Sequence, residues 1–242
     1  MRELPILMNG AMVRAVLEGC KTVTRRVVSP APYDQPVNEF GDTVLCFPNR
    51  KYKDRGWVWP NAKADILAQA PYQSGDRLYV RETFTLEHCV EGEDPPFADR
   101  RPVKGRDIDD IDGVTPLWVQ PHYRATDPAP DLSCDRPGCA QCRDRDMGPH
   151  WVPSIHMPKW AARIWLEVTA VRVERLQDAT TEQIVAEGIT SQLREYDAVV
   201  DLRQQFEVLW DGLAKPGTRW ADNPWVWVVE FRQIEREEAR QS

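Results

Sequence analysis

The sequence lacks any long apolar run, and this absence excludes a membrane-spanning helix. No stretch approaches the roughly 18 consecutive apolar residues that such a helix needs. The N-terminal segment MRELPILMNGAMV also lacks the long apolar core and the cleavage site of a secretory signal peptide. We therefore expect a cytoplasmic protein without a membrane partner.

The chain also lacks an excess of positive charge. It has 31 Lys and Arg against 38 Asp and Glu, a formal net charge of −7. An overall basic surface for nucleic acid is excluded, because that mode of binding needs clustered cations. The charge is uneven, however. Residues 1–60 hold nine Lys and Arg against six Asp and Glu, whereas residues 167–242 hold nine against fifteen. A local basic face near the N-terminus is compatible with this distribution.

Cysteine is present but sparse, with six residues in 242. In a cytoplasmic chain this favours free thiols or a metal over disulfides. Cys134, Cys139 and Cys142 stand at C-x4-C-x2-C spacing, and the C-x2-C pair is typical of half a zinc site. The candidates for a fourth ligand are Cys89, His122, His150 and His156. The alternatives are a structural zinc that staples the surrounding loop and three free thiols.

Local patterns predict short helices and strands separated by long loops. The chain is long enough for one large or two small domains with a buried core. Helices are expected at residues 9–18, 181–186 and 197–213, with a helical turn at 158–162. Strands are expected at residues 22–28, 75–84, 117–125 and 223–234, and in the later part of 151–176. Prolines and acidic residues predict irregular segments at 29–74 and 87–116, and a loop rich in Cys, Asp, Pro and Gly is expected at 127–150.

Several residues predict where these elements begin, bend or end. Asn9 and Thr180 are expected to cap helices, and Gly19 and Gly188 to end them in the left-handed conformation. A change of apolar phase near Ala170 predicts a β-bulge. The third helix is expected to bury one stripe, made of Val199, Leu202, Phe206, Leu209, Trp210 and Leu213.

Five stretches, in order, resemble the larger, phage-type ASCH-domain proteins of the PUA-like superfamily. They are the EGCKTVTRRVV opening, GDRLYVRETF, PSIHMPKWAARIWLEVTAVRVERLQD, AEGI and the closing NPWVWVVEFRQI. The resemblance implies an α+β fold, a PUA-like mixed β-barrel with peripheral short helices and long loop insertions. It implies a single domain over 1–234, with insertions at about 29–74 and 87–150 and a charged tail at 235–242.

The resemblance also implies a site. PUA-like folds mostly bind RNA or nucleobases, and one small ASCH subfamily hydrolyses the acetyl amide of acetylated cytidine. The lysine, threonine and glutamate of that subfamily correspond to Lys21, Thr24 and Glu187. Lys21 would act as base, Thr24 as nucleophile and Glu187 as the proton carrier to the departing amine. The residues alone also fit a plainer interpretation, because Lys after a helix-ending Gly and Thr in a strand are ordinary structural choices.

Other polar residues are candidates for contacting a ligand. Arg25 and Arg26 point to opposite faces of a strand, so one enters the site and the other meets phosphate or solvent. Arg81 and Glu82 pose the same choice, and an inward Glu82 would pair with Lys21 or replace Glu187 as the acid. His156, boxed by prolines, would bind a base edge or serve structure. Tyr79, Trp151 and Trp160 are candidates for stacking on a base.

Three functions from different classes follow. The first is a protein that binds a nucleoside, a modified base or a short RNA in a pocket centred on Lys21 and Thr24, without a cofactor for chemistry. The second is an amidohydrolase that removes an acyl group from the exocyclic amine of a cytidine-like nucleoside. The third is a phage accessory or assembly protein that uses the fold only as a scaffold.

Overall fold

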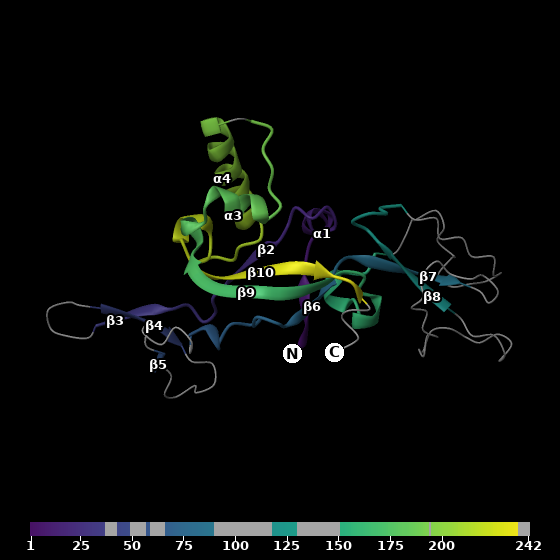
Figure 1. The fold of residues 1–242 in the computed structure, drawn as a ribbon, viewed down its shortest axis with the longest axis horizontal. Helices are drawn as coiled ribbons and strands as arrows, with labels where there is room; N and C mark the ends of the chain where they lie inside the picture. The colour runs from purple at the N-terminus through teal and green to yellow at the C-terminus, as the bar shows by residue number, and fades with distance from the viewer. Residues whose placement is uncertain are drawn as a thin grey trace. The chain divides into compact units, whose positions relative to one another are not determined.

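The computed structural model shows a mixed α+β protein (Figure 1). It describes residues 1–36, 43–48, 57–58, 66–89, 118–129, 151–193 and 195–236. The main sheet has five strands in the order β1-β6-β9-β10-β2. Their bounds are β1 Glu3–Leu7, β2 Val23–Val27, β6 Arg77–Arg81, β9 Trp165–Arg175 and β10 Trp225–Ile234.

The direction of the strands makes this a mixed sheet. β10 runs antiparallel to both β9 and β2. β1 runs parallel to β6, since the amide of Arg77 donates to the carbonyl of Arg2 and the amide of Met8 to that of Arg81. Among the described residues, β1 and β2 are the edges of this sheet. The α+β class is thus confirmed, and the closed barrel stays a prediction.

The expected bulge lies in β9, next to the predicted position. Glu230 of β10 is opposite Ala170 and Phe231 is opposite Val168, so Thr169 is the extra residue. Before the bulge, the buried face of β9 and the turn leading into it carries Ile164, Leu166 and Val168. After it, the side chains change phase, as the sequence predicted.

The helices follow their capping signals. The bounds are α1 Gly10–Leu17, α3 Thr181–Ala186 and α4 Glu195–Asp211, with 3-10 turns at Ser154–His156, Lys159–Ala161, Leu176–Asp178 and Trp220–Asp222. The side chain of Asn9 accepts from the Met12 amide, and Thr180 and Gln183 form a complete capping box. Gly19 and Gly188 have φ of 74° and 88°, the left-handed values expected after a helix.

The apolar stripe expected on α4 is only partly buried. Leu202 and Phe206 are buried and Leu209 and Trp210 pack beside them. Val199 and Leu213 are 44% and 59% exposed, so including them in the stripe was wrong. Leu213 lies beyond the last helical residue. Val199 lies near the N-terminal end of α4, which points away from β9 and β10 (Figure 1).

Contacts divide the chain into two compact units. The first is Met1–Leu4, Ala15–Leu78 and Ile164–Ser242, and the second is Pro5–Arg14 and Tyr79–Arg163. The single domain expected over 1–234 stays a prediction.

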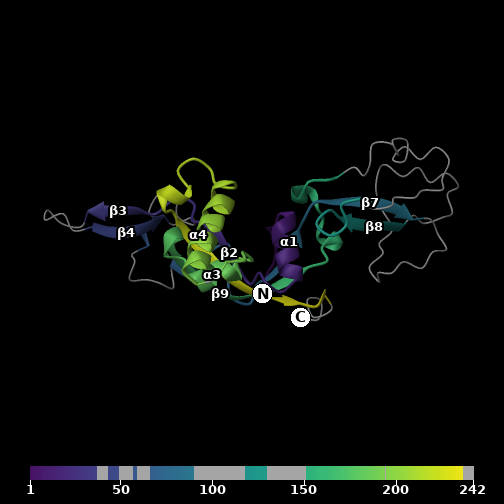
Figure 2. The same cartoon turned by 90° about the horizontal axis from the view of Figure 1, so that it is seen from above.

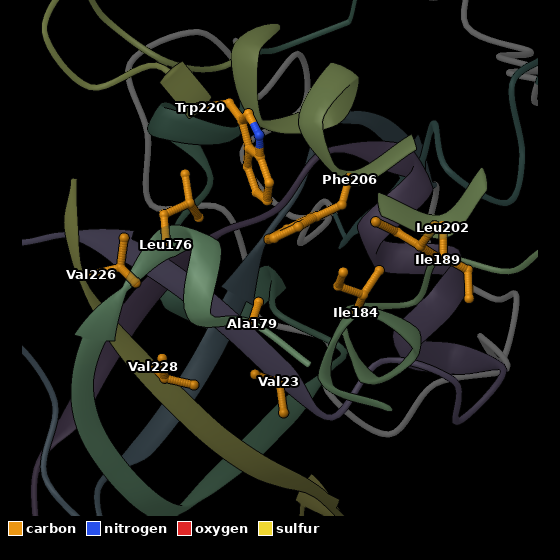
Figure 3. Packing of buried hydrophobic residues seen from close by; sticks show 10 residues of the cluster. All are labelled: Val23, Leu176, Ala179, Ile184, Ile189, Leu202, Phe206, Trp220, Val226 and Val228. Carbon is orange, nitrogen blue, oxygen red and sulfur yellow. The ribbon is translucent and has the colours of Figure 1, made fainter. Parts of the chain in front are cut away.

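The first unit has a core between the sheet and the helices. Figure 3 shows Val23, Val226 and Val228 on the strands facing Ile184, Phe206 and Trp220. Phe206 and Trp220 meet edge to face, with their ring centroids 5.7 Å apart. From above, α3 and α4 overlie β9 and β10 (Figure 2). This packing fixes α3 against β2, and it therefore also fixes Glu187, the residue that follows the last residue of α3.

The second unit contains strands β7 (Phe84–Cys89) and β8 (Trp118–Tyr123), which pair antiparallel. Its core is formed by Phe84, Met157, Ala161 and Ala162. β8 was expected, whereas β7 continues into a segment expected to be loop.

Strands also occur where the sequence predicted irregular chain. β1 was not foreseen, and β3 (Tyr33–Pro36), β4 (Thr43–Pro48) and β5 (Trp57–Val58) form a small sheet in the proline-rich segment 29–74. Prolines at strand ends and on edge strands do not interrupt the hydrogen bonds between strands. The high proline content of residues 29–74 therefore did not exclude strands, as the prediction had assumed. In the described part of the chain, none of the helices is long and apolar enough to span a membrane.

Candidate functional site

The structure brings Lys21 and Glu187 together, although 166 positions separate them. The Nζ of Lys21 donates to Glu187 Oε2 at 2.5 Å, to the backbone carbonyl of Glu187 at 3.0 Å and to that of Val23 at 2.8 Å. The side chain of Lys21 is 0% exposed and that of Glu187 is 5% exposed. The lysine is thus a buried cation held on a buried carboxylate.

Arg25 is a second buried cation on the same carboxylate. Its Nη1 donates to Glu187 Oε1 at 3.0 Å. Its Nη2 donates to Glu174 Oε1 at 2.8 Å and to Gln183 Oε1 at 2.7 Å. The guanidinium lies over the ring of Phe206, 5.7 Å from its centroid. Each oxygen of Glu187 therefore faces one cation, and these contacts offset the cost of burying the carboxylate.

The network continues across the sheet through β9. Arg25 in β2 and Arg172 in β9 are both opposite Val228 of β10, so the two arginines share a face. Arg172 pairs with Glu174 at 3.1 Å and also with Glu230. With Lys21 and Glu187 included, three cations face three carboxylates. Charge balance explains why this face of an acidic protein tolerates buried ions.

Backbone geometry sets the distance between Lys21 and Glu187. The two residues form an isolated antiparallel bridge, and the Thr22 amide donates to the Ala186 carbonyl at 2.8 Å. Gly188 follows with φ of 88°, and a Cβ placed there would lie 2.6 Å from the Cβ of Ala15. Only glycine fits both the conformation and the space. The ends of α1 and α3 therefore meet closely and hold the pair.

Thr24 is buried but lies on the other side of β2. Val23 belongs to the core beneath α3 and α4, and Arg25 contacts Phe206 of that core. Because strand residues alternate, the side chain of Thr24 points to the opposite face. Within the described residues, its hydroxyl takes no part in the hydrogen bonds of Lys21 and Glu187. The structure thus joins two of the three candidate catalytic residues and leaves the third on the reverse face.

Burial lowers the pKa of Lys21, because removing the ammonium from water disfavours its charged form. The charge and hydrogen bond of Glu187 act in the opposite direction. An ammonium has three N–H donors, and the three oxygens around Lys21 use all of them. In this arrangement the lysine has no donor left for a ligand.

Glu82 and Lys21 do not form the ion pair considered from the sequence. Glu82 is held instead by Arg163, whose Nε and Nη2 donate to its two oxygens at 2.9 and 3.0 Å. The Glu82 side chain is 2% exposed and that of Arg163 is 26% exposed. These two hydrogen bonds give each oxygen of Glu82 a partner within the second unit. In the first unit, Glu187 has the corresponding role as the partner of Lys21.

Arg26, Arg81 and His156 are three further candidates for contacting a ligand. Arg26 is partly buried, and its Nη1 donates to the Arg25 carbonyl at 3.4 Å. Arg81 is partly buried and donates to the Ile155 carbonyl, and His156 is exposed in a 3-10 turn. Their roles in binding stay predictions.

The cysteines of the proposed zinc site, Cys134, Cys139 and Cys142, lie outside the described residues, as does His150. Among the residues that are described, no three histidine, cysteine, aspartate or glutamate side chains could hold a metal ion together. His122 pairs with Asp127 at 3.3 Å. Zinc stays a prediction.

Sequence reasoning missed three partners, Glu174, Gln183 and Arg163. One signal for Glu174 was available, because Arg172 and Glu174 are two positions apart in a strand and therefore share a face. Gln183 occupies the N3 position of the capping box of α3. This capping role gave no sign that its side chain would also accept a hydrogen bond from Arg25. Arg163 precedes β9 and carries no local pattern. No protein-family model, curated protein or solved structure matches the chain.

Proposed function

We propose that this chain is an ASCH-type protein with a PUA-like fold that binds a nucleoside, a modified base or a short RNA. The proposal places the ligand beside Lys21 and Glu187. The observation that carries it is the buried ion pair between these two residues, 2.5 Å apart. Once a ligand displaces the bond between Lys21 and Glu187, the two side chains would present a donor and an acceptor side by side, the pattern that complements the edge of a nucleobase.

The energetics favour a ligand of this class. A buried charge that loses its partner is costly, so a ligand can replace part of this network only by supplying equivalent partners. It must offer an acceptor to Lys21 and a donor to Glu187 together. A base with an exocyclic amine beside a ring acceptor, as in cytosine, does so. A ligand that lacks either group would leave Lys21 or Glu187 without a partner. The free-energy cost of that buried, unpaired charge would prevent binding.

Hydrolysis is the second candidate, and the lowered pKa of Lys21 favours it. A neutral Lys21 would accept the proton of the Thr24 hydroxyl as its oxygen attacks the acyl carbon. Glu187 would then relay this proton from Lys21 to the departing amine, and attack of water on the acyl-Thr24 ester would release the acid and restore the hydroxyl. Binding is preferred, because it needs only Lys21 and Glu187, whereas hydrolysis also needs Thr24, which lies on the other face of β2. The scaffold hypothesis is third.

A thermal-shift assay with the full chain tests the binding proposal. Cytidine, N4-acetylcytidine, uridine and adenosine are compared as ligands. A ligand present at about 100 times its Kd stabilises the protein by about 2.7 kcal/mol, which raises the melting temperature. We expect cytidine-like ligands to do so in the wild type and in Glu174→Gln. Glu187→Gln should abolish the shift, because the amide carries no charge and has one acceptor oxygen in place of two.

Glu174→Gln is the matched control, since it removes a carboxylate from the same network but leaves Lys21 paired with Glu187. The proposal is wrong if no nucleoside raises the melting temperature, or if Glu187→Gln responds like the wild type. Chromatography of the N4-acetylcytidine sample separates the two candidates. Release of cytidine that Thr24→Val abolishes would establish the hydrolase instead.

A further inference from the structure

We propose that the second unit carries a binding surface for the phosphate groups of a single-stranded nucleic acid. The surface consists of Arg14, Arg124 and Arg163, and we call it the arginine surface. It lies around the turn at residues 123–127. It uses none of the residues of the Lys21–Glu187 network, so it does not depend on the function proposed above.

Three distant segments deliver these arginines to one short turn. Arg14 Nη1 donates to the Ala125 carbonyl at 3.0 Å, and Arg163 Nη1 donates to the Thr126 hydroxyl oxygen at 3.0 Å. Arg124 belongs to the turn itself. Consecutive Cα atoms are about 3.8 Å apart, so the three guanidinium groups are held against a stretch of only three residues. Like charges are not gathered in this way without cost.

The positive charge of this surface is poorly neutralised. Among the described residues, Arg14 and Arg124, both exposed, form no ion pair. Glu82 gives both of its oxygens to Arg163, and Asp127, 3.3 Å from His122, adds a second negative charge near the turn. The three arginines still exceed these two carboxylates, which leaves an excess of positive charge at the turn. Such an excess attracts a polyanion and raises its association rate.

Several arginines of the first unit lie beside carboxylates. In the first unit Arg2 faces Asp76, Arg172 faces Glu174 and Glu230, and Arg232 faces Glu167. Arg175 and Arg203 of the first unit bind backbone carbonyls instead, but they do so singly. At the turn of the second unit, by contrast, Arg14 and Arg124 lie beside Arg163, and this grouping favours a partner that supplies negative charge.

Aromatic rings give the surface a second property. The guanidinium of Arg163 lies 4.1 Å from the ring centroid of Tyr123, and that of Arg124 lies 5.9 Å from the ring of Trp151. Stacking fixes the plane of a guanidinium, and Arg124 keeps its N–H groups able to bind a phosphate in bidentate fashion, whereas Arg163 already donates to Glu82 and Thr126. Charged groups interleaved with aromatic rings are what proteins use to hold single strands, whose bases are free to stack.

Fluorescence anisotropy of a labelled oligouridylate of roughly 12 nucleotides tests the proposal, a length within the range of single-strand sites. The full-length wild type is compared with Arg14→Gln/Arg124→Gln over a salt series. The control is Arg203→Gln/Arg232→Gln in the first unit. Arg203 is a close match for the surface arginines, because it donates to a backbone carbonyl and lies 5.5 Å from the Trp220 ring centroid.

We expect the first double variant to bind at least about tenfold more weakly at low salt and the control to bind like the wild type. Each lost phosphate contact should lower the slope of log K against log salt by about 0.7. Arg14→Lys/Arg124→Lys keeps the charge and should restore most of that slope.

The proposal is overturned if the wild type does not bind the RNA, if its binding does not depend on salt, or if both Gln double variants lose affinity equally. An oligothymidylate of the same length gives the second arm. Equal affinity for it supports recognition through phosphate, whereas binding confined to RNA or to a duplex of the same length contradicts it.

Discussion

Two buried carboxylates, one in each unit, are stabilised in different ways. Glu187 is shared by two cations, Lys21 and Arg25, whose side chains are almost fully buried. Glu82 is held by one guanidinium, that of Arg163, which is partly open to water. The first arrangement removes three charged groups from solvent, and the second keeps its cation partly hydrated. The first network should therefore be the less tolerant of a change in any member.

Asp76 extends the comparison to a third carboxylate. It is also buried, but its partner Arg2 is 49% exposed. The three carboxylates are thus similar in burial, whereas their partners range from buried through partly exposed to half exposed. We infer that the exposure of the cation ranks the cost of losing each pair, because water can replace a partner only where it has access.

Lys21→Met should have the largest effect. The variant keeps an apolar chain of similar size but leaves one oxygen of Glu187 without its cation. Removing one partner of a buried pair costs about 3–5 kcal/mol. Urea unfolding followed by far-UV circular dichroism measures this loss. Adding Glu187→Gln to the variant should recover part of it, and a double variant as unstable as the single one would contradict the explanation.

Arg163→Lys should cost less, about 1.5–3 kcal/mol, the range for hydrogen bonds to charged groups. A lysine keeps the charge but cannot form the fork with both oxygens of Glu82 or stack on Tyr123. The same unfolding experiment applies, with Arg124→Lys as a control that makes no bond to a buried carboxylate. If Arg163→Lys lowered the free energy of unfolding as much as Lys21→Met, the exposure of the cation would not determine the cost of losing each ion pair.

The contribution of Asp76 should be visible in how the free energy of unfolding depends on pH. Burial by itself would raise its pKa, but hydrogen bonds from Arg2 and from the Gln73 amide lower it below the usual 3.8. A lowered folded pKa stabilises the protein above pH 3.8, and that stability is lost as pH falls through the folded value. The free energy of unfolding should therefore decline less steeply between pH 4 and pH 2 in Asp76→Asn than in the wild type. Parallel pH profiles would contradict this assignment.

Thr180→Ala should have the smallest effect, about 1 kcal/mol or less, the usual cost of losing an exposed N-cap. The capping box positions Gln183, which also accepts from Arg25. Thr180→Ser keeps the hydroxyl and should behave as the wild type in thermal melting. A loss as large as that of Lys21→Met would mean that the cap, rather than the buried charges, determines the stability of α3.

Much of the local structure could be predicted from the sequence. Gly19, Thr180 and Gly188 marked helix ends correctly, because a cap depends on a few neighbouring atoms. The bulge at Thr169 was visible as a change of phase. β1 and the small sheet of β3, β4 and β5 were missed, since their pairing depends on distant strands and their prolines resemble those of loops.

The candidate site was predictable in a more limited way. The resemblance pointed to Lys21 and Glu187, and the structure joins them. The resemblance also placed Thr24 in that site, but Thr24 points to the reverse face of β2, whereas Lys21 reaches Glu187, just after α3, on the side of Arg25. The pairing of Glu82 with Arg163 was missed, because it joins β6's end to a segment 81 positions later that no local pattern marks.

The contact between Gly188 and Ala15 limits how this protein can diverge. A larger residue at Gly188 would meet Ala15 and push apart the two helix ends beside the buried ions. It would also have to adopt a backbone conformation that side chains other than glycine rarely take. We therefore expect position 188 to accept fewer substitutions than the residues around it.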